Sequence, residues 1–225
     1  MGTRNLTMVI NKASELKVAQ YGQWDGYPSG NGIEILEFCR NKDNLTALKN
    51  SLEKCIFYND DKGFIEKYDN AVDKKTLTPQ QSFWFNNFQS RNVGANILHN
   101  ITYCDFDKLG ESQIKLYNDK EFGQDSLMCE YAYCVNFNTN KLMCFSGFNT
   151  DKEKEHEFFI TKQEEVDKEF KRLDCTKYYG IILVKEYDLN NLPSKEKFLE
   201  DLEENDDAES NDDELLFWKL AQKGN

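Results

Sequence analysis

Short apolar runs separated by turn-forming residues characterise the start of the chain. Leu6–Ile10 is a β-branched apolar run, Leu16–Trp24 mixes apolar and polar residues, and the polar stretch Asn11–Ser14 separates them. This pattern predicts a β-hairpin. Asp25–Gly32 then contains three glycines and a proline, a composition typical of a tight loop. Apolar residues recur at helical spacing directly afterwards, so the loop should lead into a helix N-terminus, whose free N–H groups favour an anion.

Helical spacing continues through the middle of the chain. Apolar residues at intervals of three and four predict a helix over Asn44–Tyr58, and a weaker periodicity predicts another over Lys62–Val72. Thr78 followed by Pro79 is typical of a helix start, because threonine caps free N–H groups and proline fits the first helical position. The same periodicity predicts a further helix over Asn92–Ile101.

Strand patterns return in the second half. Ile114–Tyr117 predicts a short strand, and Leu127–Phe137 with Lys141–Gly147 predicts a second hairpin around the turn Asn138–Asn140. Tyr178–Tyr187 contains the most apolar run of the chain and is the candidate for a central strand. We therefore predict an α+β fold: a mixed or antiparallel sheet built from two hairpins plus a central apolar strand, with helices packed on it.

The C-terminal part changes in composition. A charged helix is expected after Pro193, and residues 1–198 are expected to form a single globular α+β domain. Residues 199–214 are predicted to be a disordered acidic linker, because they contain almost no apolar side chains. Residues 215–225 form a short apolar segment that either docks back on the domain or binds a partner.

Most of the net charge of −12 comes from the acidic residues of this linker. Glu200–Glu214 contains ten acidic residues and no basic ones, which leaves 30 acidic against 28 basic residues in the rest of the chain. A nearly neutral body does not predict a broad face for duplex DNA. No apolar run is long enough to span a membrane and no signal-peptide pattern is present, so we expect a cytoplasmic protein without a membrane partner.

The number and spacing of the cysteines and histidines exclude further kinds of site. The seven cysteines include no C-x-x-C pair, which indicates buried free thiols in a reducing compartment. The two histidines, His99 and His156, are too few and too far apart for a typical zinc site. Walker and Rossmann glycine patterns are also absent. We expect neither a metal nor a cofactor.

The N-terminal segments offer groups suited to a small nucleotide site. A guanidinium at position 4 fits a phosphate, the indole and phenol of the loop allow stacking, and amides allow hydrogen bonds to a base or ribose. The candidate ligand-binding residues are Thr3, Arg4, Gln20, Gln23, Trp24, Asp25, Tyr27 and Arg91. The alternative interpretation is that Asp25 only forms a turn while Trp24 and Tyr27 belong to the core.

Four motifs carry a resemblance to a known family. They are Met1–Arg4, Gln20–Gly30, Arg91–Ala95 and Asp125–Tyr133. Together they resemble a family of uncharacterised proteins of bacteriophages and prophages, which open with Met-[Gly/Ser]-Thr-Arg and carry a Gln-Tyr-Gly-Gln-Trp-Asp-Gly-Tyr-Pro-Ser-Gly loop.

The resemblance implies a phage-like origin but no activity. It singles out the charged and phenolic residues Arg4, Asp25, Tyr27, Arg91, Asp125 and Glu130. The chain departs from the family pattern at Asn92, where the family has aspartate, and at Tyr131, where it has tryptophan. The first departure argues against an acid–base role for position 92.

Three hypotheses follow, and we favour the first. The protein binds a small nucleotide-like molecule, such as a host immune signal, and so acts against a defence response. Alternatively it is a hydrolase or phosphodiesterase-like enzyme, in which Asp25, Asp125 or Glu130 activates water while Arg4 and Arg91 stabilise negative charge. In the third hypothesis the acidic tail binds a protein partner, such as a host defence protein. The oligomeric state stays open, with a homo-oligomer compatible with each hypothesis.

Overall fold

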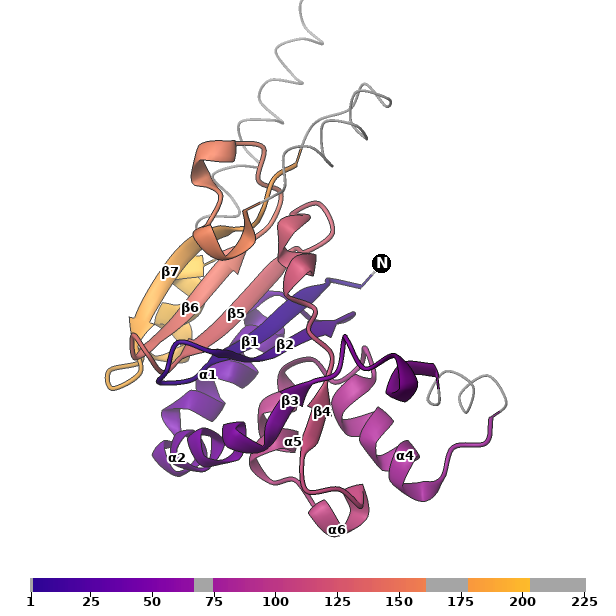
Figure 1. Ribbon diagram of the computed structural model, residues 1–225. Coiled ribbons are helices and arrows are strands. Elements are labelled where there is room, and N and C mark those ends of the chain that lie inside the picture. Colours follow the sequence, from indigo (N-terminus) through magenta and orange to yellow (C-terminus); the bar gives the residue numbers. More distant parts are fainter. Residues whose placement is uncertain (1, 67–74, 161–177, 203–225) are drawn as a thin grey trace, which may run out of the picture.

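The computed structural model describes residues 2–66, 75–160 and 178–202, and a five-stranded sheet is its main feature (Figure 1). The strand order is β2-β1-β5-β6-β7. The strands are β1 (Asn5–Ile10), β2 (Leu16–Gly22), β5 (Tyr131–Asn136), β6 (Lys141–Ser146) and β7 (Ile182–Asp188). Strands β1 and β5 pair in parallel and the other pairs are antiparallel, so the sheet is mixed. The α+β class and both predicted hairpins are confirmed.

The apolar strand expected at the centre of the sheet lies at its edge instead. Within the described residues, β7 pairs only with β6, and most of its side chains are half-buried. The central position belongs to β5, which lies between β1 and β6, and all six residues of β1 are buried. An apolar run indicates burial but not position in a sheet, because neighbouring strands and covering layers decide which faces and edges are shielded.

Residues 55–57, which were predicted to be helical, form a strand of a second, two-stranded parallel sheet. The helix predicted over Asn44–Tyr58 is α2 (Lys42–Ser51), which passes through a 3₁₀ turn into strand β3 (Cys55–Phe57). Strand β3 pairs with β4 (Ile114–Leu116). This pairing joins residues far apart in sequence, and local periodicity cannot detect it.

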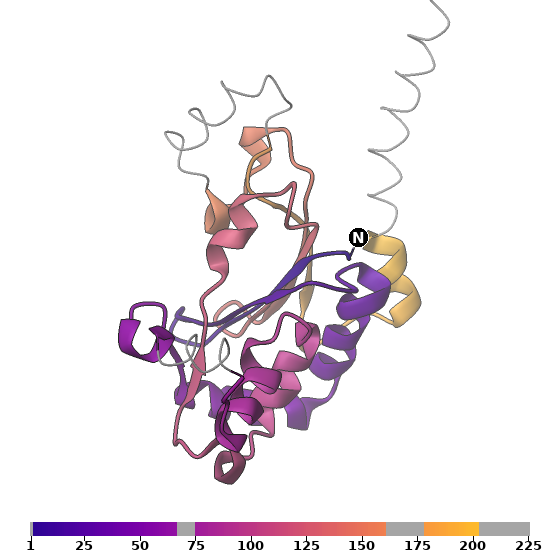
Figure 2. The ribbon, with the colours of Figure 1, turned by 90° about the vertical axis from the view of Figure 1, so that its right-hand side faces the viewer.

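Helices α1 (Ile33–Arg40) and α5 (Ile97–Thr102) lie with α2 on one face of the main sheet (Figure 2). The short helices α4 (Pro79–Trp84) and α6 (Phe106–Leu109) pack against each other, and Trp84 of α4 donates to the carbonyl of Lys115 in β4. The predicted start at Thr78 is confirmed, since its side chain accepts from the backbone of Gln81 in a capping box. Of the helix predicted over Lys62–Val72, residues 62–66 are helical, whereas 67–74 lie outside the described residues. None of the described helices has the length and apolar character needed to cross a membrane.

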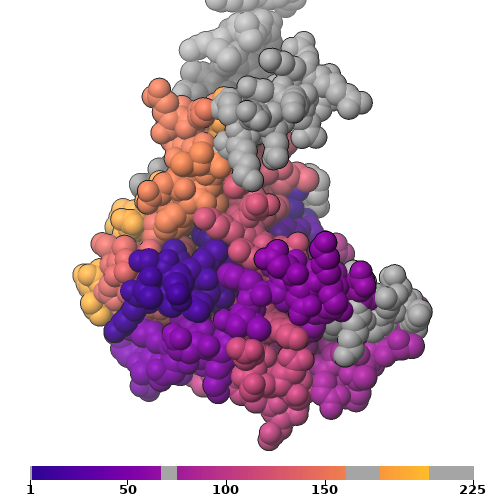
Figure 3. All heavy atoms as spheres, in the orientation of Figure 1, coloured from indigo at the N-terminus to yellow at the C-terminus, as the bar shows by residue number. Residues whose placement is uncertain are grey.

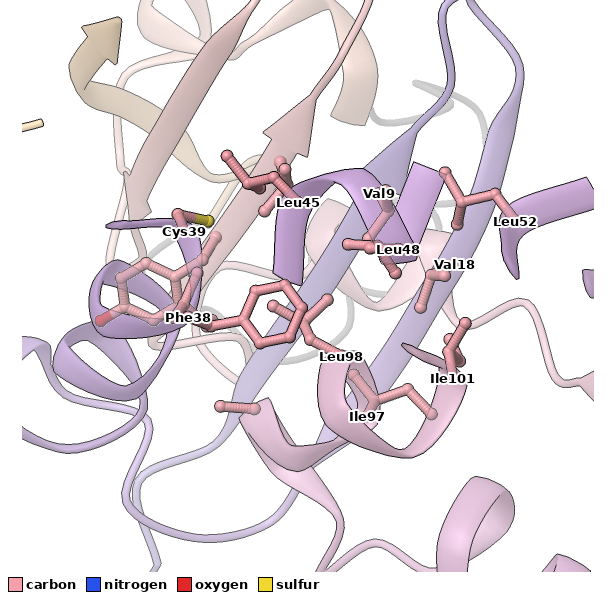
Figure 4. Close-up of a cluster of buried hydrophobic side chains, with 14 of the residues drawn as sticks. Val9, Val18, Phe38, Cys39, Leu45, Leu48, Leu52, Ile97, Leu98 and Ile101 are labelled. Carbon is pink, nitrogen blue, oxygen red and sulfur yellow. The ribbon is translucent and has the colours of Figure 1, made fainter. Parts of the chain in front are cut away.

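The core is divided by the sheet into two clusters. On the helical face, Val9 and Val18 pack with residues of α1, α2 and α5, including Phe38, Leu48 and Ile97 (Figure 4). The opposite cluster contains alternate residues of the same strands, and 3₁₀ turns at Lys120–Gln124 and Glu157–Phe159 lie beside that face. Side chains alternate between the two faces of a strand, so both clusters share the same backbone.

The described fold continues beyond the domain end expected at residue 198. Residues 195–202 are helical, and Phe198 and Leu202 are buried in the helical-face cluster. Most of the expected acidic linker and the whole apolar segment 215–225 lie outside the described residues.

Candidate functional site

Three of the four motifs singled out in the sequence meet at one end of the main sheet. In the strand register, Asn5 at the start of β1 faces Gly22 at the end of β2 and Tyr131 at the start of β5. The fourth motif joins them because the backbone N–H of Gln23 donates to the carbonyl of Arg91 at 2.9 Å. Segments separated by more than 100 residues thus form one surface near the N-terminus (Figure 1).

Hydrogen bonds fix the glycine-rich loop onto this end of the sheet. The N–H of Gly26 donates to the carbonyl of Thr3 at 2.9 Å, and the hydroxyl of buried Tyr133 donates to the carbonyl of Gly26 at 2.9 Å. The side chain of Asn31 donates to the carbonyl of Trp24 at 3.0 Å and accepts from the N–H of Ala95 at 3.0 Å. The loop is therefore a rigid part of the fold.

Two glycines show how closely these segments pack. A Cβ atom at Gly26 would lie 2.8 Å from the carbonyl oxygen of Thr3 and 2.8 Å from Cβ of Asn5. Gly94 has a φ of +51°, and its added Cβ would lie 2.9 Å from Oδ1 of Asn31. Both positions therefore require glycine for steric reasons.

The loop leads into α1, as expected, through a turn at Pro28–Gly32. The N–H of Gly32 is 3.4 Å from the carbonyl of Tyr27, and the N–H of Ile33 donates to carbonyls of the turn. Two of the N–H groups at the start of this helix are thus already used within the loop. They leave less capacity for the anion that the sequence pattern favours there.

Trp24 and Tyr27 lie on the surface of this loop, not in the core. Their side chains are 49% and 39% exposed. The indole N–H of Trp24 donates to Oδ1 of Asn92 at 3.0 Å, and the hydroxyl of Tyr27 donates to Asp25 at 3.1 Å. The hydrogen bond to the Asp25 carboxylate raises the pKa of Tyr27. Asn92, one of the departures from the family pattern, thus holds the indole in place.

The guanidinium of Arg4 lies against residues 127–130, the turn before β5. Its Nε is 3.3 Å from Oε1 of Glu130, and the backbone N–H of Arg4 donates to the same oxygen at 3.1 Å. One terminal nitrogen is 2.9 Å from the sulfur of Met128, and the other lies 3.5 Å from the carbonyl of Leu127. These contacts tie the N-terminal segment to the turn before β5.

The predicted glutamines and Thr3 also make internal contacts. Gln20 is 4% exposed and its amide donates to the carbonyl of Tyr21 at 3.0 Å. The side chain of Gln23 accepts from the hydroxyl of Tyr21 at 2.6 Å. The backbone carbonyl of Thr3 accepts from the N–H of Gly26 in the loop. Arg91 is exposed. Of the predicted ligand-binding residues, Trp24, Asp25, Tyr27 and Arg91 therefore present exposed side chains.

The three carboxylates proposed for catalysis have separate structural partners. Asp25 accepts from Tyr27, and Glu130 accepts from Arg4. Asp125 caps its own turn, since its Oδ1 accepts from the N–H groups of Leu127 and Met128, each at 3.2 Å. Among the described residues, no group of three histidine, cysteine or acidic side chains is placed to hold a metal ion.

Sequence analysis missed the residues that hold this surface together. Asn5 is completely buried and donates to the carbonyls of Gly22 and Trp24, at 3.4 and 3.2 Å. The side chains of Asn31 and Tyr133 likewise donate hydrogen bonds, to the carbonyls of Trp24 and Gly26. An asparagine or tyrosine next to an apolar run is the only local signal, and it does not show which loop will cover the side chain.

Comparisons of this chain with protein-family models, with curated proteins and with solved structures find no match.

Proposed function

We propose that this protein binds a small nucleotide-like ligand on the surface formed by Trp24, Asp25, Tyr27 and Arg91, here called the Trp24–Tyr27 surface. The supporting observation is the pair of half-exposed aromatic side chains on a loop fixed by hydrogen bonds. A base stacked on such a side chain gains about 1–3 kcal/mol. Arg91 is exposed and its carbonyl accepts from Gln23 next to the loop, so its guanidinium would supply positive charge for a phosphate.

Binding is better supported than catalysis by the contacts of the acidic side chains. Oδ1 of Asp125 accepts two N–H groups of its own turn and Oε1 of Glu130 pairs with Arg4, so each carboxylate has a structural role in the fold. Asp25 is bound to the hydroxyl of Tyr27. The resemblance to phage proteins leads us to propose further that the ligand is a host signalling nucleotide, which the protein captures in the host cytoplasm.

A single experiment distinguishes capture of the ligand from its turnover. The purified protein is incubated with cyclic dinucleotides and ADP-ribose derivatives, and the unbound fraction is analysed before and after heat denaturation. We expect one ligand to be depleted and then released intact. Release of a converted product would replace capture by hydrolysis, and failure to deplete any compound would overturn the proposal and direct attention to the acidic tail.

A pair of variants tests the surface itself. Replacing the exposed indole in Trp24→Ala should weaken ligand binding about tenfold, because the stacking contribution is lost. Tyr103→Ala is the matched control, since Tyr103 is also an exposed aromatic residue but follows α5, away from the loop. Equal dissociation constants for Trp24→Ala and the wild type in equilibrium dialysis would exclude this surface as the site.

A further inference from the structure

A groove of about 530 Å³ lies beside the edge of β2, where β3 and β4 end. It is separate from the Trp24–Tyr27 surface and shares no residue with it. The segments that form it, around residues 57–60 and 117–122, are purple and pink in the space-filling view (Figure 3). Its aromatic lining consists of Phe57, Tyr117 and Phe122.

The frame of this groove is held by backbone and amide hydrogen bonds. The side chain of Asn59 donates to the carbonyl of Asn118 at 3.2 Å and accepts from its N–H at 2.7 Å. The side chain of Asn118 in turn accepts from the N–H of Lys120 at 3.1 Å. These hydrogen bonds hold the two segments together.

Asp119 places a carboxylate within this frame. Its N–H donates to the carbonyl of Ala19 at 2.9 Å, and its Oδ2 accepts from the N–H of Tyr21 at 3.0 Å. Burial raises the pKa of Asp119 to about 6, so the side chain is mainly ionised at neutral pH. In the described part of the chain, no ammonium or guanidinium forms an ion pair with it.

The other charged residues of the groove favour an extended cation. Asp60 and Glu121 also line it, against the single ammonium of Lys120. Among the described residues, no three acidic side chains lie close enough together to hold a metal ion. Spaced negative charges between aromatic walls suit several ammonium groups joined by apolar chain, because the rings attract cations and also contact methylene groups.

We propose that this groove binds an aliphatic polyamine, with one ammonium group on Asp119 and the methylene chain against the three aromatic rings. The ligand forms charge-assisted hydrogen bonds to the carboxylate while its neighbouring amines approach the remaining acidic side chains. This site is independent of the proposed nucleotide binding, so either can fail while the other stands.

Spermidine titrated into the full chain by calorimetry is the test. The saturable affinity of Asp119→Asn should fall by about tenfold relative to the wild type, because the ionised partner of the ammonium is lost. Asp107→Asn removes the same charge from an exposed position on α6 and should leave the affinity unchanged. Any weak binding by the acidic tail is common to all three proteins, and thermal melts show whether each variant is folded.

The aromatic walls are tested separately. Tyr117→Leu should weaken spermidine binding severalfold, since Tyr117 is 37% exposed and lines the groove. Equal affinity of the wild type and Asp119→Asn would overturn the proposal. It would also be overturned if Mg²⁺ at matched ionic strength competed as strongly as spermidine, because the groove would then attract charge alone.

Discussion

Asn5 and Thr7 are buried polar residues of strand β1, and within the described residues each has one side-chain atom without a hydrogen-bond partner. The atoms are Oδ1 of Asn5 and Oγ1 of Thr7. The amide nitrogen of Asn5 donates to the carbonyls of Gly22 and Trp24, which holds the backbone at Trp24 in place. No contact of that kind explains the hydroxyl of Thr7, and unpaired buried polar groups reduce stability.

Thr7→Val should therefore stabilise the protein. Valine keeps the shape of the side chain and removes the unpaired hydroxyl, so the free energy of unfolding should rise by about 1 kcal/mol. Thr7→Ser keeps the hydroxyl and removes the methyl group, and should lower the free energy of unfolding by about 1 kcal/mol. Urea unfolding measures both. A loss of stability in Thr7→Val would show that the hydroxyl has a partner in solution.

Asp119 makes stability depend on pH. Burial raises its pKa from 3.8 to about 6, so the folded chain binds this proton more tightly than the unfolded chain. The resulting stabilisation is complete below about pH 4 and is lost as the pH rises through about 6. Asp119→Asn removes this dependence.

The stability of Asp119→Asn relative to the wild type should therefore increase from pH 4 to pH 7 by up to about 3 kcal/mol. Urea unfolding of both proteins at several pH values gives the difference directly, and other titrating groups cancel in it. A difference that stays constant over this range would mean that the carboxylate is solvated in the folded protein.

At the scale of elements, the glycine-rich loop is fixed by sterics as much as by hydrogen bonds. Gly26 lies against Thr3 and Asn5, and Gly94 has a positive φ beside Asn31. The glycines of two motifs thus have a structural explanation, whereas the exposed Trp24 and Tyr27 have no partner in the core that explains them. This contrast is what favours a binding role for the aromatic pair.

Gly26→Ala should consequently destabilise the fold. The added Cβ would lie 2.8 Å from a carbonyl oxygen, so the loop must move, at a cost of about 1–3 kcal/mol. Gly63→Ala is the control, since its Cβ would have 3.7 Å to the nearest atom and residue 63 is helical. Thermal unfolding compares the two. Equal melting temperatures for the wild type and Gly26→Ala would show that the loop yields without cost.

At the scale of the molecule, the sheet carries helices on one face and short turns on the other (Figure 2). The last described helix, residues 195–202, contributes Phe198 and Leu202 to the helical-face cluster. Phe198 is completely buried and packs against Tyr187 of β7, with 5.5 Å between the ring centroids. This helix therefore packs on the helical face of the sheet, beside β7.

Two truncations locate the end of the folded unit. A chain ending at residue 202 keeps these buried side chains and should retain the urea midpoint and nucleotide binding of the full protein. A chain ending at residue 194 loses both apolar anchors, so its free energy of unfolding should fall by several kcal/mol. A large loss of stability in the chain that ends at residue 202 would show that residues after 202 also stabilise the fold. Docking of the apolar segment 215–225 would have this effect.

The sequence determined by itself the features that depend on neighbouring residues. Hydrophobic periodicity and turn residues predicted both hairpins, the loop before α1 and the capped start at Thr78, because these structures form over short stretches of chain. The α+β class follows from the same local elements.

The tertiary structure alone decided which distant segments meet. It placed the most apolar strand at the sheet edge, paired β3 with β4, and directed Arg4 onto Glu130. It also buried Asn5 beneath the loop and left Trp24 exposed. The physical reason is that burial, ion pairing and sheet order depend on contacts between residues far apart in sequence, which no local pattern encodes.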